Sequence, residues 1–163
     1  MTRLFPVLLL LLLAGCGGSA ATSAPDVRVA VGSQQIAVHP VQYCLDGKGT
    51  RYSNAPPIIE VAPNSGVTVT VPDDVAARGW GIQVFDEKLV NKLGVLAVPK
   101  GKQAYTDLNT SDVVPPAFYL VIVENKGGAC GQFSGAWPVG FLRAGGTSTS
   151  SGNPTSSAGM PTG

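Results

Sequence analysis

Short runs in which apolar and polar residues alternate recur along most of the chain. The clearest is Val67–Val71, where three valines fall on one side and two threonines on the other. This two-residue period is that of a β-strand with one buried face. Gly, Pro, Asn and Asp separate similar runs at intervals of about 8–12 residues, as turns between strands would. The strands predicted in this way are Val27–Val31, Ile36–Tyr43, Ile58–Val61, Val67–Val71, Trp80–Phe85, Val95–Val98, Phe118–Val123 and Val139–Leu142.

Patterns typical of helices are sparse. Pro72–Gly79 has acidic residues near its start and glycine at its end, which predicts about one turn of helix. Pro40 falls inside the Ile36–Tyr43 run and predicts an edge or a bend there. Many short strands with few helices indicate an all-β fold. We expect an antiparallel β-sandwich of immunoglobulin-like or Greek-key type, with a small β-barrel as the alternative.

An apolar leader precedes the strand-rich region. Arg3 is followed by Leu4–Ala14, which is apolar throughout, as in an export signal. This stretch is shorter than the roughly 20 residues that a membrane-crossing helix needs. It ends in Leu13-Ala14-Gly15-Cys16, a pattern that resembles a lipobox, in which small residues fit a peptidase cleft and the thiol accepts a lipid. We expect membrane lipid to hold the protein on the extracytoplasmic face of the cell membrane through acylated Cys16. An ordinary secretory signal or a short membrane helix is the alternative.

Both flanks of the strand-rich region are poor in residues that form a core. Gly, Ser, Thr, Pro and Ala make up nearly all of residues 17–25 and 145–163. Such segments bury too little apolar surface to offset the entropy of the chain. We therefore expect a signal peptide at residues 1–15, a lipidated flexible tether at 16–26, one β-sandwich domain at 27–143 and a disordered tail at 144–163.

Charge does not point to a partner. The chain has 11 basic and 10 acidic residues, which are scattered without a block or a stripe. Nucleic-acid binding would need a basic footprint, so no nucleic-acid partner is expected. Recognition of anionic lipid through a polybasic patch is unsupported for the same reason.

Two cysteines remain if Cys16 carries lipid. Cys44 and Cys130 form an even pair in a chain that is expected outside the cytoplasm, where disulfides persist. A bridge between them would close a long loop and stabilise the fold by about 4–5 kcal/mol on the chain-entropy model. Two free thiols are the alternative. Trp80 lies too far beyond Cys44 to reproduce the antibody pattern of cysteine and tryptophan.

The residues do not assemble a recognisable catalytic or metal site. His39, the single histidine, lies five residues before Cys44. In a strand this odd separation turns the two side chains to opposite faces, about 16 Å apart, which argues against a Cys/His nucleophile pair. Cys-x-x-Cys, paired histidines and acidic loops of calcium-binding spacing do not occur. We expect no metal, no cofactor and no enzymatic activity.

Aromatic residues cluster near the end of the strand-rich region. Phe133, Trp137 and Phe141 are the candidates for an apolar or sugar-binding groove, because amphipathic rings suit such sites. The alternative is that these rings fill the core of the sandwich.

Several short motifs occur together in a recognisable order. After the lipobox come Val41-Gln42-Tyr43-Cys44, the Val67–Pro72 strand, the Val75–Trp80 turn and the Phe118–Val123 strand. This order resembles a group of small actinobacterial lipoproteins that share a domain of unknown function. The resemblance implies an exported, sandwich-like domain and supplies neither a substrate nor catalytic residues. Related chains look to place a second cysteine soon after the Tyr-Cys pair, whereas here the next is Cys130.

The function that these patterns favour is a membrane-anchored binding or interaction module of the cell envelope. Its partner would be an envelope protein or a glycan. One alternative is a solute- or glycan-binding lipoprotein that uses the groove around Phe133 and Trp137. The other is an envelope hydrolase whose site carries none of the motifs above.

Overall fold

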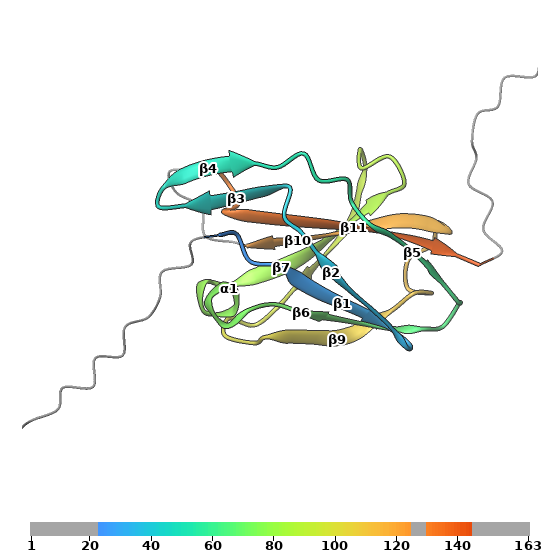
Figure 1. Cartoon of the computed structure of the whole chain (residues 1–163). Coiled ribbons are helices and arrows are strands. Elements are labelled where there is room, and N and C mark those ends of the chain that lie inside the picture. Colours follow the sequence, from blue (N-terminus) through green and yellow to red (C-terminus); the bar gives the residue numbers. More distant parts are fainter. Residues whose placement is uncertain (1–22, 125–129, 145–163) are drawn as a thin grey trace, which may run out of the picture.

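The computed structural model describes residues 23–124 and 130–144, which form two facing β-sheets and one short helix (Figure 1). The leader, Cys16, most of the expected tether and nearly all of the expected tail lie outside the described residues. The described part holds no helix that is both long enough and apolar enough to cross a membrane.

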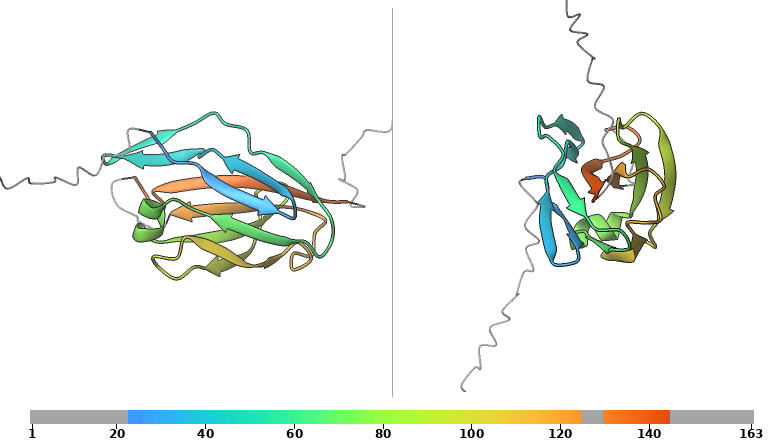
Figure 2. Two further views of the ribbon diagram at one scale, coloured as in Figure 1. Left: turned by 60° about the horizontal axis from the view of Figure 1, so that its bottom comes forward. Right: turned by 90° about the vertical axis from the view of Figure 1, so that its right-hand side faces the viewer.

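The smaller sheet has the order β2-β1-β6-β9 and the larger one the order β4-β3-β11-β10-β7-β8, with β5 beside β11. Neighbouring strands run antiparallel except for β5 and β11, which are parallel. The end-on view in Figure 2 shows the two sheets as separate layers. The predicted sandwich is therefore confirmed, and the barrel alternative is wrong. The strands are β1 (Val27–Val31), β2 (Gln34–Val38), β3 (Gln42–Leu45), β4 (Lys48–Arg51), β5 (Ile58–Val61), β6 (Gly66–Thr70), β7 (Trp80–Asp86), β8 (Lys92–Ala97), β9 (Ala104–Asn109), β10 (Ala117–Glu124) and β11 (Gly135–Arg143).

The core lies between the inward faces of the two sheets. Valines at alternate positions of β1 and β6 are fully buried, as the period-two pattern predicts. They meet larger side chains from the other sheet. The largest fully buried apolar side chains are Trp80, Trp137, Phe118, Phe141, Ile82, Leu120 and Ile122.

The predicted Ile36–Tyr43 strand is in fact two strands in different sheets. β2 pairs with β1 in the smaller sheet, whereas β3 pairs with β11 in the larger one. The chain crosses between the sheets at His39–Val41, where Pro40 prevents a continuous ladder. The bend expected at Pro40 is confirmed, and the single strand is corrected.

β11 is longer than the predicted Val139–Leu142 strand, although it contains Pro138. Beside it, β3 pairs with Gly135 and Ala136, while β5 pairs with Gly140 and the residues after it. The side of β11 toward which the nitrogen of Pro138 points therefore has no partner strand at that position. Proline lacks the N–H that would bond to a strand on that side. Because no strand pairs there, Pro138 removes no hydrogen bond from the sheet, and the interior strand β11 tolerates it.

The predicted helix is confirmed as α1 (Asp73–Arg78). Gly79 ends it with a φ of 96°, a conformation that favours glycine. The predicted disulfide is confirmed as well, because Cys44 on β3 is bonded to Cys130, with 5.9 Å between their Cα atoms.

The two ends of the sandwich carry different features. α1 and the β3–β4 hairpin lie at the end where the described chain begins at Ser23 (left in Figure 1). β7 and β10 run the length of the larger sheet, so that Trp80 lies opposite Glu124 at this end and Asp86 lies opposite Phe118 at the other. We call these the Ser23 end and the Asp86 end.

Candidate functional site

An open, apolar groove of about 400 Å³ runs along one side of the sandwich toward the Asp86 end. It lies where the last strand of each sheet, β8 and β9, leaves the seam between the sheets open. The loop between β9 and β10 forms the opposite wall. The lining residues are Val84, Leu93, Gly94, Leu96, Leu108, Asp112, Val113, Val114 and Pro115.

The loop that forms this wall is held by a set of specific hydrogen bonds. Thr110 is fully buried, and its hydroxyl donates to the carbonyl of Ala62 and accepts the N–H of Ser65. The guanidinium of Arg143 donates to the carbonyls of Thr110 and Val114, at 3.1 and 2.8 Å. Because these bonds tie the loop to two other segments, the β5–β6 loop and β11, the groove is formed before any ligand arrives.

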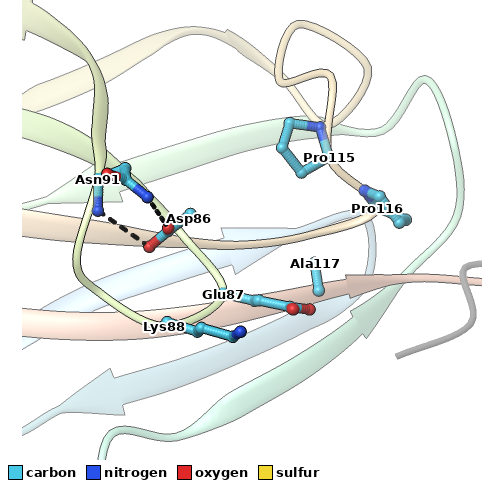
Figure 3. A pocket seen from close by; sticks show the side chains of 7 residues that line it. All are labelled: Asp86, Glu87, Lys88, Asn91, Pro115, Pro116 and Ala117. Carbon is cyan, nitrogen blue, oxygen red and sulfur yellow. Dashed lines mark hydrogen bonds between the residues drawn. The ribbon is translucent and has the colours of Figure 1, made fainter. Parts of the chain in front are cut away.

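A polar hollow of about 360 Å³ adjoins the groove and shares Pro115 with it. Figure 3 shows it between the β7–β8 turn, which carries Glu87 and Lys88, and the prolines that precede β10. Asp86 shapes the turn, since its carboxylate accepts the N–H groups of Val90 and Asn91. These hydrogen bonds, that from Val90 first, lower the pKa of Asp86.

Exposed apolar side chains gather on the two elements that border the groove, and Leu93 and Val114 among them line it. Of the described large hydrophobic residues that are exposed, all except Ile58 lie on the β7–β8 hairpin or on the β9–β10 loop. Monomeric proteins rarely expose apolar side chains in such a concentration, so it indicates a surface that contacts another molecule. We call these five residues the apolar rim: Leu89, Val90, Leu93, Val95 and Val114, the last being 89% exposed.

The aromatic residues proposed from the sequence do not line this groove. Trp137 is fully buried, donates from its indole to the carbonyl of Pro25 and packs edge-on against Tyr43. Phe141 is buried and stacks on Phe118. The expectation of a binding groove on these rings is wrong for Trp137 and Phe141, because their strand is interior and turns them into the core. Phe133 is half-buried, beside the Ser23 end of the sheet.

His39 and Cys44 do not form a catalytic pair. The sulfur of Cys44 is bonded to Cys130, so it offers no thiolate. The ring Nδ1 of His39 lies 2.7 Å from a carboxylate oxygen of Asp26, on the exposed surface. Within residues 23–124 and 130–144, His, Cys, Asp and Glu do not come together in threes as a metal site requires.

A polar cluster around the buried Glu124, at the Ser23 end, was not foreseen from the sequence. Arg78 at the end of α1 donates to the carboxylates of Glu124 and Asp74 and to the hydroxyl of Tyr43. Glu124 is only 1% exposed, and its second carboxylate oxygen has no partner among the described residues. No short motif could reveal the cluster, since its members come from β3, α1 and β10.

The ionisation of this cluster follows from its burial. Burial raises the pKa of Tyr43 to about 12, and the negative charge of Glu124 adds to the shift. Burial by itself would lower the pKa of Arg78, but the hydrogen bonds to Glu124 and Asp74 outweigh it and leave that pKa raised. Near neutral pH the phenol of Tyr43 is therefore neutral and Arg78 is charged, an arrangement that suits fastening α1 to the sheet better than acid–base catalysis.

Comparison with known proteins finds a family model that matches much of the chain. The model of a family described as "Protein of unknown function (DUF2771)" matches residues 20–126, about two thirds of the chain. The match runs from just before β1 to the end of β10 and includes Cys44 but not Cys130. No curated protein and no solved structure matches the chain. The resemblance to a family with a domain of unknown function is confirmed, while its actinobacterial and lipoprotein aspects stay predictions.

Proposed function

The chain belongs to the DUF2771 family, whose function is unknown, and from that premise we propose that it is a membrane-anchored binding module of the cell envelope. Lipid on Cys16 holds it at the extracytoplasmic face of the membrane. The apolar groove between β8 and the β9–β10 loop binds a partner protein of the envelope.

The proposed location is supported by two independent features. The lipobox ending in Cys16 supplies an attachment point for more than one acyl chain, which stable anchoring requires. The disulfide between Cys44 and Cys130 fits an oxidising compartment, because bridges of this kind rarely persist in the cytoplasm.

The observation that carries the binding role is the pre-formed groove, which two exposed residues of the apolar rim, Leu93 and Val114, help to line. Its position supports the same role. The described chain starts at the Ser23 end, so a tether that leads from Cys16 attaches there, whereas the rim residues Leu89 and Val90 lie at the Asp86 end. An anchored domain would therefore hold its groove away from the lipid surface. A glycan-binding role loses its support, since Trp137 and Phe141 are buried.

Cys16→Ser should release the protein from membranes, because the substitution removes the thiol that carries the lipid. Fractionation of cells into membrane and soluble material, with detection of the domain in each, measures the result. The matched control is Cys130→Ser, which leaves the anchor intact and should stay with the membranes. Sedimentation of the Cys16→Ser protein with the membranes would place the anchor elsewhere.

A photo-crosslinking residue in place of Val114 should capture an envelope protein in intact cells, because this side chain is 89% exposed beside the groove. The same residue in place of Thr50, on the exposed hairpin at the Ser23 end, is the control. A further Leu93→Lys substitution should remove the Val114 adduct, since it puts a charge on the groove wall. Equal adducts from Val114 and Thr50, or none from Val114, would contradict a role for the groove.

A further inference from the structure

The strands that end the two sheets differ in what they present at their edges. The outer strands β4, β2 and β9 carry exposed charged or polar side chains, such as Arg51, Gln35 and Asp107. Such residues commonly protect a sheet edge from pairing with another chain. β8 carries no charge or polar side chain from Leu93 to Ala97. Its single charged side chain, Lys92, lies at the first residue of the strand, so Leu93–Ala97 is an unprotected, apolar stretch of sheet edge.

The backbone of β8 can accept a further strand. It pairs with β7 on one side, and no strand of residues 23–124 or 130–144 pairs with its other side. The register with β7 shifts next to Leu93, and from Gly94 to Ala97 it is regular. A free row of N–H and C=O groups is completed by the backbone of another extended segment, which is the principle of strand addition.

The groove determines which side chains such a segment should carry. Gly94 and Leu96 of β8 line the groove together with Leu108 and Val113. A strand added to β8 would therefore pass over the opening and direct every second side chain toward these residues. Apolar side chains at alternate positions of the added strand would therefore be buried in the groove beside the free edge of β8. The edge and the groove thus act as one site.

Charge complementarity favours a strand other than β8 of a second copy. Lys92 is exposed at one end of the edge, and no described acidic residue forms an ion pair with it. Two copies that paired through β8 could place only residues of Lys92–Ala97 beside Lys92. That segment contains no acid, so no register of β8 against itself provides one. A segment of another protein with an acidic residue at this position would complement Lys92, which β8 of a second copy would not.

We infer that β8 takes up an extended segment of another protein as an added strand, with alternate apolar side chains in the groove and an acidic residue beside Lys92. This inference rests on the proposed function, because it specifies the partner chemistry of the same groove.

The test attaches a strand to the protein itself. Arg143 contacts the groove wall through the carbonyls of Val114 and Pro116, so the nineteen residues 145–163 continue from a point beside the groove. A segment fused after Gly163 is then present at millimolar effective concentration, provided that the linker spans the distance. The probe is six residues of alternating valine and threonine that end in glutamate, because an antiparallel strand meets Lys92 with its last residue. A second probe ends in lysine, and a third contains only glycine and serine.

Hydrogen exchange of the purified full chain gives the readout. We expect the glutamate probe to slow exchange of Lys92–Ala97 by about tenfold or more, as a new ladder of hydrogen bonds would. The lysine probe should slow it less, and the glycine–serine probe not at all. Leu93→Lys should abolish the protection, whereas Thr106→Lys on the exposed edge of β9 should preserve it.

Three results would overturn the inference. The first is unchanged exchange in β8 with the glutamate probe, and the second is equal protection by the glutamate and lysine probes. The third is a stable dimer of the unfused chain, protected at β8, which would assign the edge to a second copy. If β8 stays unprotected while the Val114 adduct still forms in cells, the groove binds a partner without strand addition. If the Val114 adduct is absent as well, the proposed function fails too.

Discussion

Arg78→Met is expected to lower the free energy of unfolding by about 3–5 kcal/mol, the usual cost of leaving one charge of a buried ion pair alone. Glu124 is 1% exposed, and Arg78 donates to one of its carboxylate oxygens, while the other has no partner among the described residues. Methionine keeps much of the packing of the arginine stem but provides no donor. Urea unfolding of the full chain, followed by tryptophan fluorescence, measures the loss.

Two further variants separate charge from packing. Arg78→Met combined with Glu124→Met should recover most of the lost stability, since an apolar pair can replace a buried ion pair at little cost. Lys100→Met removes an exposed lysine near α1 and should change stability by less than about 0.5 kcal/mol. A loss of under about 1 kcal/mol for Arg78→Met would contradict the view that this cluster fastens α1 to the sheet.

Removing the disulfide is the second change with a large expected effect. Cys44→Ser together with Cys130→Ser should lower the free energy of unfolding by about 4 kcal/mol, because the bridge closes a long loop in the unfolded chain. The two cysteines lie 86 positions apart, so the loop contains most of the strands of the sandwich. The shift of the urea midpoint relative to the parent protein measures the effect.

Reduction provides a matched experiment on the parent protein. A thiol reductant should shift its unfolding curve to that of the double serine variant and should leave the variant unchanged. Cys16→Ser is the control substitution, since Cys16 lies outside the bridge and should not alter the curve of the sandwich. Coinciding curves for the parent protein with and without reductant would contradict a stabilising bridge.

The pattern of the sequence predicts best those strands that have one buried and one exposed face. The predicted Val27–Val31 strand has the same bounds as β1, and the Val67–Val71 strand differs from β6 by one residue at each end. In both, the buried valines alternate with exposed or half-exposed residues, which is the signal that the period-two pattern detects. Pro72–Gly79 carried a comparable signal for α1 in its acidic start and glycine end.

The alternating pattern does not predict strands that lack a buried apolar face. Every residue of β4 is exposed, and Leu108 is the single buried residue of β9, so neither was predicted. Their pairing is provided by neighbours: β4 follows β3 through the turn at Asp46-Gly47, and β9 pairs with β6. Both residues of this Asp-Gly turn have positive φ, and two residues of this kind between strands indicate a hairpin, a signal that the alternating pattern does not use.

The groove could not be predicted from the sequence, for a related reason. Its walls come from β7, β8, β9 and the loop that follows, and each contributes one to four residues. None of these contributions differs in pattern from an ordinary strand or turn. Only the order of the sheets, with β8 and β9 at neighbouring ends, makes Leu96 and Val113 walls of one opening.

By itself the sequence determined the all-β class and the position of α1. It also predicted the pairing of Cys44 with Cys130, which the structure confirms, and a lipidated leader, which stays a prediction. Each of these depends on local period, on spacing or on the chemistry of a few neighbouring residues. The tertiary structure alone decided that Trp137 and Phe141 belong to the core, that Arg78 meets Glu124, and that β8 is a free apolar edge. These depend on which strands become neighbours. An apolar residue beneath a second sheet is part of the core, whereas the same residue at an open edge stays exposed.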